Sequence, residues 1–185
     1  MTDMMDDMNE ERESLYELTS VGAIRAAHAL SMILGHEIAA CTPRVQQIDS
    51  DWADGHWGTG VIFEVDGELT GLVAILLPTV SRDVLGALLL GRDTPRDCES
   101  ATRSALRELG NIVASHTLSG IADRLGSRIL LSVPTLVMER ADLAFQERLA
   151  ESGANRCVES EFTNAEGEIH ARLLFAAQTK AVEPA

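Results

Sequence analysis

Three polar residues in the second half of the chain, Ser104, Glu108 and Asn111, have a spacing that places them together on one face of a helix. At about 100° per residue, they and Ser115 fall within about 60° of one another around the axis. The apolar residues of the same segment fall on the opposite side, at Leu106, Leu109 and Val113. Carboxylate, carboxamide and hydroxyl groups in one line can accept and donate several hydrogen bonds. An exposed helix face is polar by default, however, so the line alone also fits a solvated surface.

Gly110 and Asn111 favour a functional interpretation of this line. Asn is a poor helix former, and Gly is less favourable than Ala in a helix by about 1 kcal/mol. A sequence that places both residues in mid-helix accepts a local penalty, and such penalties concentrate at functional sites. We therefore treat Ser104, Glu108 and Asn111 as a candidate functional site.

Residues for other kinds of chemistry lack a suitable arrangement. Cys41, Cys98 and Cys157 are far apart and odd in number, so they predict neither a zinc site nor a disulfide framework, and we expect them to be small buried side chains. His36-Glu37 lacks the second histidine of a zinc-protease helix. The sequence has no recognisable Ser-His-Asp or Cys-His arrangement and no Gly-rich phosphate loop. It therefore predicts no metal and no cofactor of its own, and it disfavours a small-molecule enzyme.

Helical and strand patterns supply the elements that must position the polar line. Helical periodicity covers 13–35 and 99–125, and a short strand with a proline follows each helix. Two hairpins are expected, at 58–65 with 69–77 around Asp66-Gly67, and at 158–163 with 169–176 around Glu166-Gly167. Shorter extended segments are expected at 38–41, 43–48, 128–133 and 136–138, and short helices at 80–90 and 141–149.

The same order of elements occurs twice along the chain. Residues 17–43 align with 108–134 without a gap, which places Leu34-Gly35 on Leu125-Gly126 and Pro43 on Pro134. The repeat predicts an α/β (α+β) fold, a pseudo-twofold single domain in which two long helices pack on a mainly antiparallel sheet of hairpins. The expected boundaries are an acidic tail at 1–11, a domain at 12–178 with halves 12–95 and 96–178, and a second tail at 179–185.

The formal net charge of -14 disfavours nucleic acid and anionic membranes as partners, because both attract a positive surface. The chain has no uninterrupted apolar run of about 18 residues and no basic signal-peptide start, so we expect a cytoplasmic protein. Of the 15 basic residues, only Lys180 is a lysine. Excess carboxylate with almost no lysine favours a halophilic protein, because concentrated salt screens the self-repulsion. The alternative is a GC-rich genome with a bias to Arg and Ala.

The segment Ala105-Leu106-Arg107-Glu108-Leu109-Gly110-Asn111-Ile112, with Ser104 before it, resembles the motif of the CheC/CheX/FliY family of chemotaxis phosphatases. The similarity is closest to the CheC branch and extends from about Glu13 to Ala176. It includes Ser132-Val133-Pro134 and both Gly-Glu hairpins. No FliN-like domain follows, which argues against the FliY branch. The resemblance implies a CheC-like fold and a role in two-component signalling.

The resemblance also implies a reaction, hydrolysis of the aspartyl phosphate of a CheY-type response regulator. Asn111 would hold a water in line with the phosphorus. Glu108 would accept a charge-assisted hydrogen bond from the receiver's lysine, and Ser104 would support the helix edge or the contact. Mg²⁺ would be supplied by the receiver, and no covalent intermediate on this chain is implied.

The first half departs from the motif and carries Glu13, Glu17 and Ser20 at the aligned positions. Glu17 keeps the carboxylate, but Ser20 replaces the carboxamide of Asn111 and is too short to reach the water. Glu13 adds negative charge where a phosphoryl group must approach. We therefore expect one active site per chain and a degenerate, inactive second site.

An alternative function is a non-catalytic adaptor with the same fold. The resemblance implies CheD as a further partner, and the degenerate half could bind CheD or a response regulator. An adaptor has no need of a carboxamide at Asn111, so this residue discriminates between the two functions.

Overall fold

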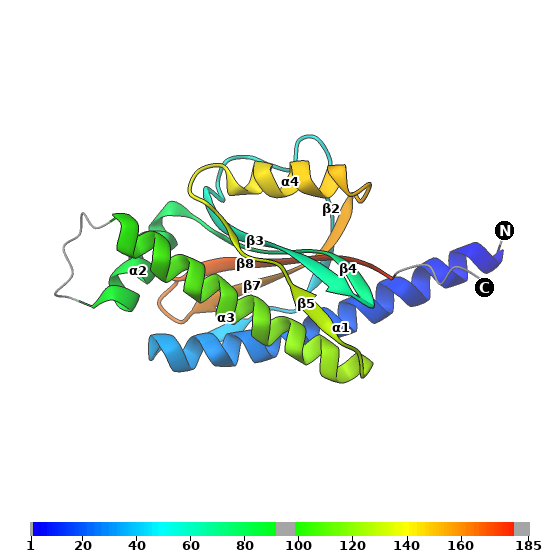
Figure 1. Ribbon diagram of the computed structural model, residues 1–185, viewed down its shortest axis with the longest axis horizontal. Coiled ribbons are helices and arrows are strands. Elements are labelled where there is room, and N and C mark those ends of the chain that lie inside the picture. The colour runs from blue at the N-terminus through cyan, green and yellow to red at the C-terminus, as the bar shows by residue number, and fades with distance from the viewer. Residues whose placement is uncertain (1, 92–98, 180–185) are drawn as a thin grey trace.

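The computed structural model describes residues 2–91 and 99–179, with side chains described for 15–91 and 99–177 (Figure 1). The helices are α1 (Thr2–Leu34), α2 (Thr79–Leu90), α3 (Glu99–Leu125) and α4 (Ala141–Glu151). The strands are β1 (Ile38–Ala40), β2 (Arg44–Gln47), β3 (Thr59–Gly67), β4 (Leu69–Leu77), β5 (Ile129–Leu131), β6 (Thr135–Val137), β7 (Arg156–Asn164) and β8 (His170–Thr179). Among these described elements, no helix is both long and apolar enough to cross a membrane.

The strands form one sheet in which every described pair is antiparallel. Its order is β1-β7-β8-β4-β3-β5, with β2 also paired to β7 and β6 also paired to β3. This confirms the expected mixed fold with an antiparallel sheet. If each strand of the first half is exchanged for its counterpart in the second half (β1 for β5, β3 for β7, β4 for β8), the strand order reads the same in reverse. A twofold arrangement of two repeats would give this symmetry. The internal repeat itself stays a prediction.

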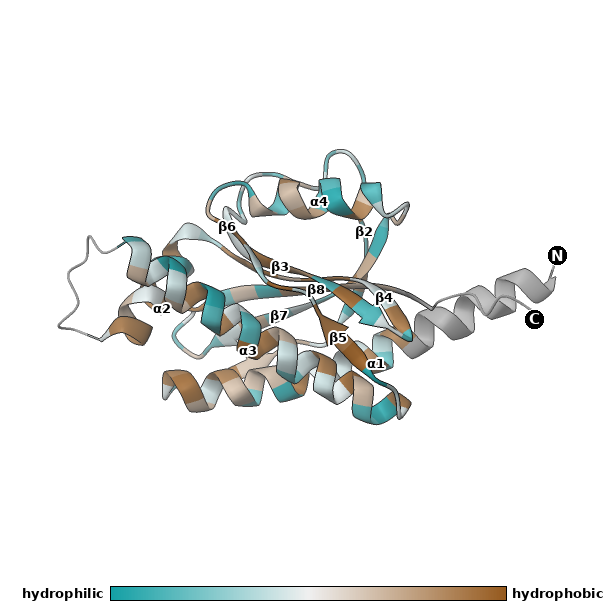
Figure 2. Cartoon of the chain, in the orientation of Figure 1, coloured by the Kyte–Doolittle hydropathy of each residue, from teal (hydrophilic) through white to brown (hydrophobic). Residues whose placement is uncertain are grey.

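Helices cover both faces of the sheet (Figure 1). The long helices α1 and α3 lie against each other on one face, and α4 packs on β3 and β4 from the other. The strands alternate accordingly: Val61 and Phe63 belong to the core beneath α1 and α3, whereas Ile62 belongs to the core beneath α4. In Figure 2 the central strands are mainly hydrophobic, while α3 alternates between hydrophilic and hydrophobic residues.

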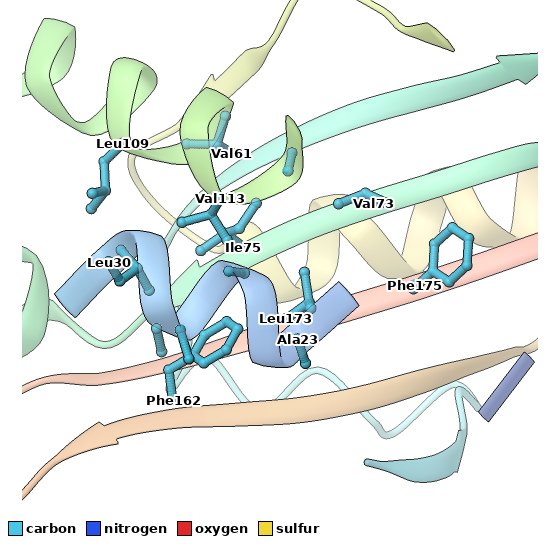
Figure 3. Packing of buried hydrophobic residues seen from close by; sticks show 14 of the residues in the cluster. Ala23, Leu30, Val61, Val73, Ile75, Leu109, Val113, Phe162, Leu173 and Phe175 are labelled. Atoms are coloured by element: carbon cyan, nitrogen blue, oxygen red, sulfur yellow. The ribbon is translucent and has the colours of Figure 1, made fainter. Parts of the chain in front are cut away.

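The core beneath the long helices holds α3 on the sheet (Figure 3). Leu109 and Val113 of α3 are buried in it, together with Val61 and Ile75 of the central hairpin. Each fully buried aliphatic side chain stabilises the fold by about 1.5–3 kcal/mol. This packing fixes which face of α3 is turned away from the sheet.

Both expected hairpins and both short helices are present, but the start of the chain differs from expectation. The segment 1–11 was expected to be a tail, whereas α1 is helical from Thr2 onward. Met and Glu are good helix formers and acidic residues near a helix start interact favourably with its dipole, so nothing in this acidic segment stops the helix. The expected boundary between the halves at 95/96 and all but Thr179 of the second tail lie outside the described residues.

Candidate functional site

Helix α3 turns the predicted polar line away from the sheet. Ser104 and Glu108 are exposed, and Asn111 and Ser115 are half-buried. The residues buried on the other side of the helix are Leu106, Leu109, Gly110, Val113, Ala114, Thr117, Leu118, Gly120 and Ile121. The helical period of the sequence thus places the three candidate residues on one accessible edge.

The polar groups of this edge are available to another molecule. No hydrogen bond or ion pair joins the side chains of Ser104, Glu108 or Asn111 to any residue that the structure describes. The Asn111 carboxamide can therefore accept hydrogen bonds at its oxygen and donate others from its NH₂ group. Glu108 lies three residues earlier on the same helix face, within reach of the same bound group.

Two clefts of the described structure lie away from the candidate residues of α3. One cleft, of about 580 Å³, lies near α4 and is lined by residues that include Glu64, Thr70 and Arg148. A second, of about 660 Å³, lies beside α1 and β1. Neither cleft includes a residue of α3. The candidate residues therefore lie on the surface of α3, outside both clefts.

Gly110 has a packing role that corrects the interpretation of the Gly-Asn pair. A Cβ atom at Gly110 would lie 2.7 Å from Val61 Cβ and Cγ2, and 2.9 Å from Val61 Cγ1. The helix therefore approaches β3 more closely than any side chain at this position would allow. Gly110 is explained by this contact, so only Asn111 retains the unexplained helix penalty.

The aligned residues of the first half lie on α1, which packs beside α3. Glu17 is exposed and Ser20 is half-buried. Glu13 lies within α1, but its side chain is outside the described residues. The two candidate sets therefore occupy separate helices on the same face of the sheet, and the structure does not merge them into one site.

The cysteines and histidines form no metal-binding group within the described ranges. Cys157 is buried, as expected, and its burial raises the pKa of the thiol well above the ordinary range. Cys41 is exposed, which contradicts the expected burial, because it follows the short edge strand β1. Cys98 lies outside the described residues.

Sequence reasoning missed a charged network on the opposite face of the sheet. Glu159 of β7 is buried, and its Oε1 atom lies 2.6 Å from Arg44 Nη2 and 3.3 Å from Arg172 Nε. Glu161 lies 3.2 Å from both Arg44 and His170 Nε2. Burial alone would raise the pKa of Glu161, but the hydrogen bond and charge of His170, with Arg172 and Arg44, hold it below its ordinary value. The available signal was two carboxylates, Glu159 and Glu161, at alternate positions of a predicted strand.

An aromatic side chain completes this network. The guanidinium of Arg172 lies 4.1 Å from the ring centroid of Trp57, and His170 contacts the same ring edge-on. The Oε2 atom of Glu159 has no hydrogen-bond partner in the part of the chain that the structure describes. Trp57 belongs to the core beneath α4, so the network lies on the face of the sheet away from α3.

Comparisons with known proteins agree on one family. Residues 102–138, which contain the polar line, match the CheC-like family. The CheY-P phosphatase CheC of Bacillus subtilis (strain 168) is 26% identical over 154 residues, which cover 77% of this chain and 73% of that protein. CheC1 of Halobacterium salinarum (strain ATCC 29341 / DSM 671 / R1), named provisionally as a CheY-P phosphatase, is 30% identical over 131 residues, covering 68% and 67%.

Solved structures share the fold. FliY of Thermotoga maritima has a TM-score of 0.67 at 22% identity and covers 90% of each chain. The matching chain of the CheX-CheY-BeF₃-Mg²⁺ complex from Borrelia burgdorferi has a TM-score of 0.61 at 16% identity, covering 89% of this chain and 97% of that one. At these identities the structural likeness concerns the fold alone.

Proposed function

The chain belongs to the CheC/CheX/FliY family, close to CheC, and on this premise we propose that it hydrolyses the aspartyl phosphate of a CheY-type receiver with Asn111 as the water-positioning residue. The observation that carries the proposal is the unpaired Asn111 carboxamide beside the exposed Glu108 on the outer edge of α3. Relatives named as CheY-P phosphatases support the reaction class. A homologous fold found in complex with CheY supports the kind of partner.

The proposed reaction is an in-line displacement at phosphorus. The water oxygen forms a bond to phosphorus while the bond to the receiver's aspartyl oxygen breaks, which releases inorganic phosphate and restores the carboxylate. Both protons of the water leave with the phosphate, as dihydrogen phosphate, which then exchanges protons with the solvent. The receiver supplies Mg²⁺ and a lysine, so this chain needs only to position the water and the docked receiver.

Asn111 and Glu108 divide the positioning between them. The oxygen of the Asn111 carboxamide accepts a hydrogen bond from the water and orients it toward the phosphorus. The Glu108 carboxylate accepts a charge-assisted hydrogen bond from the receiver's lysine and fixes the docking, with Ser104 one turn away supporting the contact. Ser20 of α1 has no carboxamide, so the first half contributes no second active centre.

The test is a phosphate-release assay with a phosphorylated CheY-type receiver, at low and at multimolar salt. Asn111→Ala should lower the stimulated rate roughly 10²-fold, because a water that is no longer held in line must be captured from solution. The matched change Ser20→Ala, at the aligned position of α1, should leave the rate within about twofold of wild type, because the proposal assigns that residue no part in positioning the water. Circular dichroism and the thermal midpoint establish that each variant is folded.

The same assay distinguishes the phosphatase from the non-catalytic adaptor. If Asn111→Ala releases phosphate as fast as wild type, the carboxamide has no catalytic role. If in addition neither protein releases phosphate faster than the receiver alone, the chain is a binding protein for a response regulator or CheD. Glu108→Ala is expected to raise KM more than it lowers kcat, because its role is docking.

A further inference from the structure

Gly110 is the point of closest approach between α3 and the sheet. It is buried, and a Cβ atom there would lie within 2.9 Å of three atoms of the Val61 side chain. Contacts under about 3.0 Å between carbon atoms are strongly repulsive, because the optimal separation is about 3.5–4.0 Å. Only glycine fits on this surface without moving the helix.

Val61 cannot yield to a larger residue on the helix. One of the atoms concerned is its Cβ, whose position is set by the backbone and does not change with the side-chain rotamer. The backbone itself is held on both sides, since Val61 pairs with Ile75 of β4 and with Leu136 of β6. The strand is therefore a rigid support, and any added atom at Gly110 must displace the helix.

The helix is also held on both sides of Gly110. Toward its start, Thr102 contacts α2, where a Cβ at Gly86 would lie 3.3 Å from Thr102 Cγ2. Toward its end, Gly120 lies close to α1, where its Cβ would be 3.2 Å from Gly22 Cα. With both flanks held, a displacement at Gly110 bends α3 outward between them instead of moving it as a rigid body.

We propose that Gly110 and Val61 act as a seat that sets the position of the Asn111 carboxamide for catalysis, with Gly110 as a positioning residue. This inference rests on the proposed function. Asn111 is the next residue after the seat and Glu108 is two residues before it, so a bend at Gly110 changes their placement relative to each other and to Ser104. A misplacement of about 1 Å is enough to lose much of the benefit of an oriented reactant.

The experiment measures kcat and KM for phosphate release from a phosphorylated CheY-type receiver. Gly110→Ala should lower kcat about tenfold or more, with KM changed by less than about threefold, because docking survives and alignment does not. Gly120→Ala is the matched control: the same substitution on the same helix, also in a tight contact, but remote from Asn111. It should keep kcat within about twofold of wild type, because its contact does not reach the aligned water.

Two double variants give a readout that lost stability cannot produce. In the Gly110→Ala background, Val61→Ala removes two of the three clashing atoms and Val61→Gly removes all three. Without a clash to relieve, both changes would only lower stability, because they enlarge a cavity and weaken the strand. The seat nevertheless predicts that adding Val61→Ala to Gly110→Ala raises kcat, and that adding Val61→Gly raises it more. If Gly110→Ala alone does not fold, the two double variants still carry the comparison.

The outcomes separate the inference from the function on which it rests. If Asn111→Ala is inactive while folded Gly110→Ala keeps the wild-type kcat, the seat is wrong and the proposed function stands. Folded double variants as inactive as Asn111→Ala also overturn the seat. If Asn111→Ala keeps full activity, the proposed function and the seat fail together.

Discussion

Glu161 links three strands of the sheet through its charge. It lies on β7 and contacts Arg44 of β2 as well as His170 and Arg172 of β8. Its carboxylate form is favoured by these partners, which hold its pKa below the ordinary value despite burial. The group therefore stabilises the fold only while it is ionised, and its contribution depends on pH.

We predict that Glu161→Gln flattens the acid side of the stability profile. A carboxyl with a depressed folded-state pKa contributes stability that is present above its unfolded pKa of about 4.3 and is lost as pH falls through the lower folded value. The wild-type free energy of unfolding should thus fall more steeply below about pH 5 than that of Glu161→Gln. Urea denaturation at several pH values measures this difference.

Glu147→Gln is the control for this prediction. Glu147 is exposed on α4 and has no ion pair among the residues described, so its profile should follow that of wild type. Parallel profiles for wild type and Glu161→Gln would show that the network does not couple Glu161 to folding.

The polar edge was predictable from sequence at the scale of single residues, whereas the charged network was not. Ser104, Glu108 and Asn111 share a face because of the helical period, which is a local property of the chain. Arg44 and Glu159 meet across a separation of 115 residues, which depends on strand order. Gly110 was noticeable in the sequence because glycine is unfavourable in a helix. Its explanation is the contact with Val61, about fifty residues away on β3, and local patterns do not predict that contact.

At the scale of elements, α3 is positioned by its crossing with α1. Gly22 of α1 lies against Thr117 of α3: a Cβ at Gly22 would be 2.7 Å from the Thr117 carbonyl oxygen and 2.9 Å from its Cγ2. Gly120 faces Gly22 one turn further along. Small residues at a crossing let two helices approach closely, and here they hold the end of α3 that lies beyond Ser104, Glu108 and Asn111.

We predict that Gly22→Ala destabilises the protein although Ala is the better helix former. The propensity gain is about 1 kcal/mol, but the added methyl meets a backbone carbonyl that no rotamer change can move, and overpacking of this kind costs about 1–3 kcal/mol. The net expectation is a lower midpoint in chemical denaturation. Gly86→Ala is the control. The atom nearest to a Cβ added at Gly86 would be Thr102 Cγ2 at 3.3 Å, a side-chain atom and not a backbone carbonyl. Equal midpoints for Gly22→Ala and wild type would contradict the tight crossing.

Local patterns identified most elements, and the errors are those of non-local origin. Turn glycines and alternating apolar residues gave both hairpins, now β3-β4 and β7-β8, and helical periodicity gave α3 at 99–125. The start of α1 was placed too late, because an acidic composition was interpreted as a tail although it contains no helix breaker. The pairing of β1 and β2 with β7 in the other half could not be read from either half alone.

At the scale of the whole molecule, the two halves are interlocked in one sheet. The first-half strands β1 and β2 pair with β7, and the second-half strands β5 and β6 pair with β3. Each half therefore completes the edge of the other, and neither presents a finished sheet by itself. This arrangement brings α1 and α3 side by side, so the helix with the carboxamide and the helix with Ser20 are supported by the same sheet.

The charge of the whole molecule leads to the last prediction. A net charge of -14 on 185 residues produces self-repulsion that favours expanded states, and salt screens it, with a Debye length of about 10 Å at 0.1 M and about 3 Å at 1 M. The thermal midpoint should therefore rise by roughly 5 °C or more between about 0.1 and 2 M KCl. For a chain of this size, a change of about 1 kcal/mol in the free energy of unfolding shifts the midpoint by about 2–4 °C. Differential scanning calorimetry at fixed pH measures the shift.

Salting-out of apolar surface would also raise the midpoint, so a second series must separate it from screening. Screening by a 1:1 salt is nearly complete at about 1 M, whereas exclusion of cosolutes from the surface grows steadily with concentration. The electrostatic explanation therefore predicts a rise that is steep below about 1 M KCl and shallow above it, and a smaller rise in sucrose. If the midpoint does not change with salt, the halophilic interpretation is wrong. The arginine-rich, lysine-poor composition then reflects the base composition of the genome. In that case the phosphatase assay should show no preference for concentrated salt.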